Sequence, residues 1–366
     1  MDDRLQKMNE LGQAPWVDEL SREDIQNGGL EQMIEDGIVG VTSNPAIFQK
    51  AIGDSDLYDD QLQELAEKED DPKEIFWHIA QKDIQDACDI FKTVYDRTNG
   101  QDGWVSLEVQ PDIAFDADAT IEEAQRLHDM VDRPNLFVKI PATIPGLIAI
   151  EEMISRGCSI NVTLVFSLER YREVAQAYMR GLQKLVDNGG DPSGVHSVAS
   201  FFISRIDSEA DERLAELGAE DLKGRLAIDN GKLAYQAYQQ IFGGSWWRSL
   251  EEQGANKQRL LWASTSTKDP DYRDVLYVES LVGPETVNTM PKDTIEAVKD
   301  HAEIQSTLEE GIEDAKQLFE RLREAGLDYE GVTNTLEVEG VQKFADPFNE
   351  MLEEIEKKSS QLARQS

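Results

Sequence analysis

The sequence predicts an α/β fold: a closed (β/α)8 barrel of the TIM type with additional helices, including a C-terminal helix packed on the barrel. Short strand-like runs alternate with helical runs along most of the 366 residues, a pattern typical of a parallel sheet covered by helices. There are eight such runs, the number that closes a TIM barrel. No G-x-G-x-x-G motif follows the first run, which disfavours the alternative of an open doubly wound sheet.

The eight expected strands are short runs rich in apolar residues, and most precede acidic or amphipathic helical sequence. They are Trp16–Glu19, Ile38–Asn44, Val105–Val109, Leu136–Pro141, Ile160–Leu164, Ser197–Ser204, Leu260–Thr265 and Thr286–Pro291. Long helical stretches are expected in the outer layer, at about 58–97, 206–242 and 296–326. A final stretch from Val341 to Lys358 has an apolar stripe at helical spacing, formed by Phe344, Phe348, Leu352 and Ile355. It predicts a packing helix.

The segment Asn188–Gly194 contains turn residues and is expected to be a connecting loop rather than a domain linker. We find no internal repeat and no low-complexity segment. The sequence therefore predicts one domain over residues 1–366.

The fourth expected strand carries a lysine, Lys139, within the apolar run Phe137-Val138-Lys139-Ile140-Pro141. Alternate side chains of a strand point to opposite faces, so Lys139 shares a face with Phe137. Parallel strands are usually buried on both faces, and burial disfavours the charged form of a lysine, which makes the amine a nucleophile toward carbonyl carbons. The alternative is an edge strand on which Lys139 extends into water.

Other expected strands also carry polar residues two positions apart, and so on one face. They are Asp18, Thr42, Asn44, Ser106, Glu108, Asn161, Thr163, Ser200, Ser204, Ser264 and Ser266, with Phe202 at the same parity. In a barrel this face is the interior, near the C-terminal strand ends where barrel enzymes place their chemistry.

Each of these residues also has a structural interpretation. Asp18 can act as a helix N-cap, Glu108 can simply pair with Lys139, Phe202 can fill the core, and a lone Asn or Thr can satisfy a buried hydrogen bond. Together, however, one amine, two carboxylates and several amides and hydroxyls are costly for packing alone. They are typical of a Schiff-base site.

The chain is strongly acidic, with 73 acidic and 36 basic residues and a net charge of −37. The acids are spread along the chain as solvated helix faces, and their field repels nucleic acid and anionic membranes, so we expect neither as a partner. We interpret the charge as an adaptation to a high-salt cytoplasm, where self-repulsion is screened.

Cysteine usage and the chain start favour an intracellular protein without a metal site. Cys88 and Cys158 do not form a disulfide framework, and no Cys/His spacing is typical of a metal site. No apolar run approaches the roughly 18 residues of a membrane span. The start, Met1-Asp2-Asp3-Arg4, lacks the form of a secretory signal, so we expect a cytoplasmic location.

Six short motifs carry a resemblance to a known family. They are Val41–Phe48, Ser106–Val109, Val138–Thr143, Ile160–Ser167, Ser200–Arg205 and Trp262–Thr265. Each is weak by itself, but their order and spacing are specific. The chain resembles transaldolases of the longer, single-domain bacterial kind, from about Trp16 to Pro291, and the C-terminal helices match more weakly.

The resemblance implies a transferase of the pentose phosphate pathway that needs no cofactor. It would move a dihydroxyacetone unit from sedoheptulose 7-phosphate or fructose 6-phosphate to glyceraldehyde 3-phosphate or erythrose 4-phosphate. In this reading Lys139 forms an imine with the ketone, and Asp18 takes the proton from the C4 hydroxyl. Glu108, with Thr163 orienting a water, shuttles protons during dehydration of the carbinolamine.

The resemblance also implies substrate-binding residues. Asn44, Asn161 and Ser200 would hold the dihydroxyacetone hydroxyls, Thr42 would support the site, and Phe202 would shield the enamine from water.

The expected phosphate site departs from the family pattern. Arg205 suits phosphate oxygens, although it can instead pair with Asp207 on a solvated face. Many transaldolases have Ser-x-Arg after strand seven, whereas this chain has Ser264-Thr265-Ser266-Thr267-Lys268. Ser264, Ser266 and Lys268 are therefore the candidates for the second phosphate contact.

Two other functions stay open at this stage. A related barrel aldolase that releases free dihydroxyacetone has the same lysine, but a polar residue in place of Phe202 would suit that reaction better. A catalytically inactive acidic barrel that acts as a binding protein is the other alternative. We expect a monomer or a homodimer.

Overall fold

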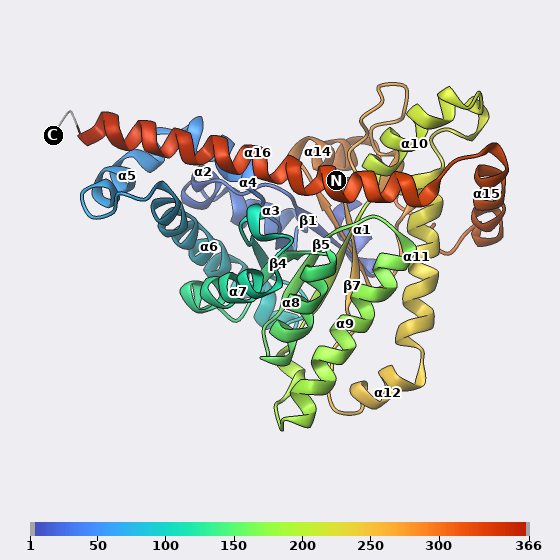
Figure 1. Ribbon diagram of the computed structural model, residues 1–366, viewed down its shortest axis with the longest axis horizontal. Helices are drawn as coiled ribbons and strands as arrows, with labels where there is room; N and C mark the ends of the chain where they lie inside the picture. Colours follow the sequence, from blue (N-terminus) through green and yellow to red (C-terminus); the bar gives the residue numbers. More distant parts are fainter. Residues whose placement is uncertain (1–3, 364–366) are drawn as a thin grey trace.

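The computed structural model describes residues 4–363 and shows a closed barrel of eight parallel strands surrounded by helices (Figure 1). The strands are β1 (Gln13–Val17), β2 (Gly40–Val41), β3 (Trp104–Glu108), β4 (Leu136–Pro141), β5 (Ile160–Val165), β6 (Ser197–Phe202), β7 (Arg259–Ala263) and β8 (Thr286–Met290). Pairing of β1 with β8, from Gln13–Thr286 to Val17–Met290, closes the barrel. The predicted (β/α)8 fold is confirmed, and the open sheet is excluded.

Helices follow most of the strands and form the outer layer, as Figure 1 shows. They are α1 (Arg4–Glu10), α2 (Arg22–Gln26), α3 (Gly29–Asp36), α4 (Pro45–Gly53), α5 (Asp59–Ala66), α6 (Pro72–Arg97), α7 (Ala117–Val131), α8 (Ile144–Ser155), α9 (Leu168–Asp187), α10 (Ser204–Glu216), α11 (Leu226–Phe242), α12 (Ser245–Glu251), α13 (Leu276–Ser280), α14 (Lys292–His301), α15 (Ile312–Ala325) and α16 (Tyr329–Ala363). Four 3-10 turns join them: η1 (Asp56–Tyr58), η2 (Pro111–Ile113), η3 (Pro192–Gly194) and η4 (Glu220–Leu222). None of the helices within residues 4–363 is long and apolar enough to cross a membrane.

The predicted strand boundaries are correct for β4 and close for most others. The first strand was placed too late, since it spans Gln13–Val17 rather than Trp16–Glu19. The second is limited to Gly40–Val41, because the chain then turns into α4. Ser204, the expected end of the sixth strand, instead begins α10.

The three long helical stretches are each divided in two by a short connection. The stretch 58–97 contains α5 and α6, 206–242 lies over α10 and α11, and 296–326 lies over α14 and α15. The predicted loop at Asn188–Gly194 contains η3. Residues 1–3, which include most of the chain start considered above, lie outside the described residues, as do residues 364–366. One domain over 1–366 remains a prediction.

Aromatic side chains fill the barrel interior below Lys139. Phe137 lies two residues before Lys139 on the same face and stacks on Trp104, with 4.1 Å between ring centroids and 14° between planes. Trp16 stacks on Phe137 at 6.2 Å. A Cβ atom at Gly40 would lie 2.5 Å from the Trp16 ring, so β2 needs glycine there. The polar groups above therefore rest on a rigid apolar layer.

The last helix, α16, crosses the barrel as the long red helix of Figure 1. It packs on α4, α5, α6, α10 and β5. Phe344, Phe348 and Ile355 of the predicted stripe are buried and Leu352 is half-buried. Phe348 contacts Phe76 edge-on at 5.6 Å. The prediction of a C-terminal packing helix is confirmed.

Candidate active site

Lys139 lies inside the barrel and faces Glu108 on the neighbouring strand. The register of β3 and β4 pairs the two residues directly, and 2.9 Å separates Lys139 Nζ from Glu108 Oε2. Each side chain is 6% exposed. The ammonium also donates to the Ser43 carbonyl at 3.4 Å. The edge-strand alternative is therefore excluded, and the expected pairing with Glu108 is present.

The environment of Glu108 favours the neutral form of its carboxyl more than water does. Burial raises the pKa of the Glu108 carboxyl, while the positive charge of Lys139 opposes this shift. Because the Glu108 carboxyl lies 2.9 Å from the Lys139 amine, a proton can pass directly between the two groups. This arrangement suits chemistry in which the amine must become neutral and then attack a carbonyl.

A chain of hydrogen bonds crosses the barrel beside Lys139. Ser200 Oγ donates to Asn161 Oδ1 at 2.7 Å, and Asn161 Nδ2 donates to Ser106 Oγ at 3.1 Å. All three side chains are buried. The Asn161 side chain thus satisfies neighbouring polar groups, as the structural interpretation expects, and it orients the Ser200 hydroxyl.

Asp18 follows β1 and is held by Thr42, which follows β2. Thr42 Oγ1 donates to Asp18 Oδ1 at 2.6 Å and lies 2.6 Å from Thr289 Oγ1. The N-cap of α2 is Ser21, whose hydroxyl accepts from the Asp24 N–H at 3.1 Å. The N-cap interpretation of Asp18 is therefore wrong, and its carboxylate faces the barrel opening.

Two further polar residues have hydrogen-bonding groups to spare. Asn44 caps α4, because its Oδ1 accepts from the Ile47 N–H at 3.1 Å, and this leaves its amide NH₂ group available. The buried hydroxyl of Thr163 has no hydrogen-bond partner within residues 4–363. Buried polar groups are normally paired, so the Thr163 hydroxyl is suited to a ligand, and the half-buried Asn44 amide can donate to the same ligand.

These side chains surround a cavity of about 140 Å³ at the C-terminal ends of the strands. Eleven of the thirteen predicted site residues line it: Asp18, Thr42, Asn44, Lys139, Thr163, Ser200, Phe202, Arg205, Ser264, Ser266 and Lys268. Glu108 and Asn161 do not line it, but they contact Lys139 and Ser200 directly. The structure thus brings the predicted residues together at one site.

Two cations at the cavity suit an anionic ligand. Arg205 is half-buried, and its Nη1 atom is buried without a hydrogen-bond partner in the described part of the chain. Burial lowers the pKa of its guanidinium, opposed by Asp18 and Glu108. Lys268 is exposed overall, yet loss of hydration and the repulsion of Arg205 lower the pKa of its ammonium. An anion bound between Arg205 and Lys268 would stabilise the charged forms of both side chains.

Arg205 does not pair with Asp207, so that alternative is wrong. The Asp207 carboxylate instead accepts hydrogen bonds from the Ala227 N–H at 2.7 Å and the Tyr277 hydroxyl at 3.0 Å. The Arg205 guanidinium lies 5.2 Å from the ring centroid of Phe202 and 6.0 Å from that of Phe344. It is directed to the cavity rather than to the helix surface.

The two serines after β7 lie beside these cations. Ser264 adopts a left-handed backbone conformation, with φ +55°, and its hydroxyl lies 2.9 Å from the Ser204 hydroxyl. Lys268 Nζ donates to Ser266 Oγ at 2.8 Å. A non-glycine residue in this conformation is uncommon and is often found at functional sites.

Sequence reasoning missed one aromatic lining residue. Phe344 belongs to α16, some 200 residues after Lys139, and its ring centroid lies 5.2 Å from Lys139 Nζ. The sequence signal was present, since Phe344 is in the apolar stripe, but a stripe does not reveal which surface it covers. Ala263, Thr289 and Pro291 also line the cavity and were not predicted.

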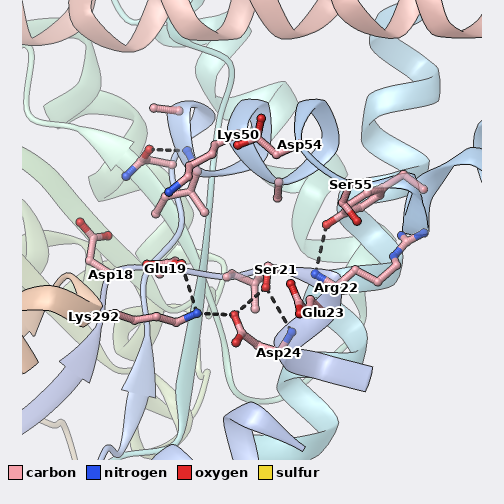
Figure 2. Close-up of a pocket in the computed structure, with 16 residues that line it drawn as sticks. Asp18, Glu19, Ser21, Arg22, Glu23, Asp24, Lys50, Asp54, Ser55 and Lys292 are labelled. Carbon is pink, nitrogen blue, oxygen red and sulfur yellow. Dashed lines mark hydrogen bonds and ion pairs between the residues drawn. The ribbon is translucent and has the colours of Figure 1, made fainter. Parts of the chain in front are cut away.

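A second, larger cavity of about 500 Å³ adjoins the first and shares Asp18 and Asn44 with it. Figure 2 shows Lys292 between two carboxylates of this cavity, Glu19 at 3.1 Å and Asp24 at 2.7 Å. Lys139 does not line it. Within residues 4–363, no group of three or more His, Cys, Asp or Glu side chains is arranged to hold a metal ion.

Comparison with known proteins identifies the family. The family model for transaldolase/fructose-6-phosphate aldolase matches residues 15–355. The chain belongs to this family. It is 48% identical to Transaldolase 2 of Streptomyces coelicolor, with 99% of each chain covered. It is 46% identical to the transaldolase of Frankia alni, with 100% of this chain and 99% of the relative covered.

A third relative, the transaldolase of Mycolicibacterium paratuberculosis, is 46% identical over 96% of each chain. These matches confirm the predicted transaldolase family and a transferase of the transaldolase type. The family match includes the C-terminal helices as far as residue 355, and so includes Phe344 on α16.

Proposed function

We propose that this transaldolase-family protein transfers a dihydroxyacetone unit between phosphosugars through an imine on Lys139. The donor would be fructose 6-phosphate or sedoheptulose 7-phosphate, and the acceptor glyceraldehyde 3-phosphate or erythrose 4-phosphate. The observation that carries the proposal is a buried lysine, 2.9 Å from a buried carboxylate, at the base of a cavity with unpaired polar groups. A protonated imine accepts the electron pair of the breaking carbon–carbon bond, so the cleavage needs an acid and a base at the right positions.

Glu108 would carry out the first of these proton transfers. It would take a proton from the Lys139 ammonium, and the neutral amine would then attack the ketone carbon. Loss of water from the resulting carbinolamine needs a proton on the leaving oxygen, which Glu108 can return. The unpaired hydroxyl of Thr163 supports a role in orienting the water.

Asp18 would act as the base in the cleavage step. Its carboxylate would remove the proton from the C4 hydroxyl while the bond between C3 and C4 breaks and the aldose phosphate leaves. Thr42 already donates to one Asp18 oxygen at 2.6 Å and so fixes the direction of the other. The enamine left on Lys139 would then attack the aldehyde of the acceptor, and Asp18 would return the proton to the new hydroxyl.

Other residues would bind the sugar and its phosphate. The free amide group of Asn44 and the Ser200 hydroxyl, oriented by Asn161, suit the hydroxyls of the dihydroxyacetone unit. Arg205 and Lys268, with Ser264 and Ser266, suit the phosphate in place of the missing Ser-x-Arg motif. The apolar Phe202 would protect the enamine.

The test is borohydride reduction in the presence of fructose 6-phosphate at high potassium chloride, followed by peptide mass spectrometry. Borohydride converts an imine to a stable amine, so we expect a dihydroxyacetone-derived mass on the peptide that contains Lys139. The variant Lys139→Ala should give no adduct. Lys50→Ala removes an exposed lysine at the neighbouring cavity and should give a normal adduct. A folded wild-type protein without an adduct would contradict the proposal.

Product analysis separates the remaining alternatives. A transaldolase consumes fructose 6-phosphate rapidly only when an acceptor aldehyde is present, whereas an aldolase releases free dihydroxyacetone without one. A binding protein would give neither product. We further propose a cytoplasmic location and a monomer or homodimer, which cell fractionation and light scattering would test.

A further inference from the structure

The ring of Phe344 closes one side of the catalytic cavity. It is 6% exposed and lines the same cavity as Lys139. Its centroid lies 5.2 Å from the Lys139 ammonium and 6.0 Å from the Arg205 guanidinium, within the range of cation–π contacts. Phe202, from the barrel wall, also lies 5.2 Å from Arg205. The site therefore has one aromatic wall from the barrel and a second from α16.

The helix that carries Phe344 is fixed to the barrel on both sides of it. Before Phe344, Arg213 Nη2 donates to Thr335 Oγ1 at 3.0 Å, and Arg170 lies 3.3 Å from Glu337. After it, Lys358 Nζ donates to the Ile52 carbonyl at 2.8 Å. These contacts hold the ring in place and distinguish it from a side chain that closes the cavity only occasionally.

The chemistry of the enamine gives such a ring a task. The enamine carbon can form a bond to the aldehyde carbon of the acceptor, which completes transfer. It can instead take a proton from water. Protonation leaves the imine of dihydroxyacetone, and addition of water then releases free dihydroxyacetone and the Lys139 amine. Both reactions use the same residues and the same steps until the enamine has formed. Access of water to the enamine carbon therefore decides which reaction follows.

We infer that Phe344 is a positioning residue for transfer, whose ring keeps water from the enamine carbon and so favours the acceptor aldehyde over protonation. The inference rests on the proposed function. It also assigns a catalytic consequence to α16 beyond packing, because the ring reaches Lys139 only when this helix is docked.

The experiment measures the partition of the enamine. Enzyme at high potassium chloride is supplied with fructose 6-phosphate and erythrose 4-phosphate, and free dihydroxyacetone is measured per sedoheptulose 7-phosphate formed. For Phe344→Ala we expect this ratio to rise roughly 3- to 10-fold, since a change of 1.36 kcal/mol between two barriers alters a rate ratio tenfold. Phe344→Leu keeps an apolar side chain and should give a smaller rise.

The matched control is Met351→Ala, which truncates another fully buried residue of α16 that does not line the cavity. It removes packing volume from α16 but leaves the Phe344 ring and the helix contacts of Thr335, Glu337 and Lys358 in place, so its ratio should equal that of the wild type. An unchanged ratio in Phe344→Ala, or an equal rise in Met351→Ala, would overturn the inference. Borohydride trapping on the wild type distinguishes the two proposals: an adduct with no change in ratio removes only the role of Phe344, and no adduct removes both.

Discussion

Asp207 offers a prediction that can be worked through quantitatively. Asp207 lies two residues after Arg205, the residue proposed to bind phosphate, and its side chain is buried. Its carboxylate accepts hydrogen bonds from the Ala227 N–H and the Tyr277 hydroxyl. Burial, with a smaller contribution from the nearby Asp211 carboxylate, raises the pKa of this carboxyl from 3.8 to about 7, although the hydrogen bonds from Ala227 and Tyr277 oppose the shift. The substitution Asp207→Asn keeps the oxygen that accepts from Ala227 and removes the titrating proton.

The direction of the effect follows from proton binding. Between about pH 4 and pH 7 the folded state binds more protons at Asp207 than the unfolded state does, so the free energy of unfolding falls as pH rises through this window. At 1.36 kcal/mol per pKa unit, the wild-type protein should lose about 3 kcal/mol of its free energy of unfolding between pH 5 and pH 7. Above pH 7 Asp207 is ionised in both states, so the destabilisation that it causes no longer changes with pH. Asp207→Asn should therefore stabilise the protein more at pH 8 than at pH 5.

The assay is urea unfolding of both proteins at pH 5 and pH 8 in the same potassium chloride concentration. We expect the stability difference between Asp207→Asn and wild type to grow by about 3 kcal/mol from pH 5 to pH 8. Removal of any negative charge from a chain of net charge −37 also relieves repulsion, and Asp60→Asn on the exposed surface controls for this. If the two substitutions have the same pH dependence, the assigned protonation of Asp207 is wrong.

Three further outcomes are expected. Arg205→Gln should raise the KM for fructose 6-phosphate roughly 10- to 100-fold with a smaller change in kcat. The reason is the loss of charge-assisted hydrogen bonds to phosphate, which are worth about 1.5–3 kcal/mol. An unaltered KM would mean that the phosphate binds elsewhere. Phe202→Tyr should increase free dihydroxyacetone release in the assay without acceptor, because a hydroxyl at this wall of the cavity can hold water near the enamine. The thermal unfolding midpoint should rise between low and molar potassium chloride as repulsion within the acidic chain is screened, and a midpoint that is constant or falls would contradict the high-salt interpretation.

The barrel was predictable from the sequence because each strand has a pattern of apolar and polar residues that can be recognised from neighbouring residues alone. Leu136–Pro141 is apolar on both faces except at Lys139, and this strand was placed correctly to the residue. The second strand was predicted too long, because Asn44 reads as part of an extended run. Its side chain caps α4 instead, and that hydrogen bond depends on the following turn.

The site was partly predictable for the same reason. Residues such as Glu108 and Lys139 are brought together by strand parity and by the chain order of a barrel, which are both visible in sequence. Phe344 was not predictable as a lining residue, since its contact with Lys139 depends on the path of α16 across the barrel. The absence of a pair between Arg205 and Asp207 also depends on tertiary contacts, because Tyr277 and Ala227 compete for that carboxylate.

The position of α16 after all eight strands has a consequence for biosynthesis. Phe344 lies 205 residues after Lys139, so on a ribosome that adds about 5–20 residues per second the lysine is made roughly 10 to 40 s before its aromatic cover. When Lys139 is made, strands β5 to β8 have not yet been synthesised, so the barrel does not yet enclose the lysine. Synthesis of α16 is thus the step that supplies the aromatic cover of Lys139, the residue on which we propose that the imine forms.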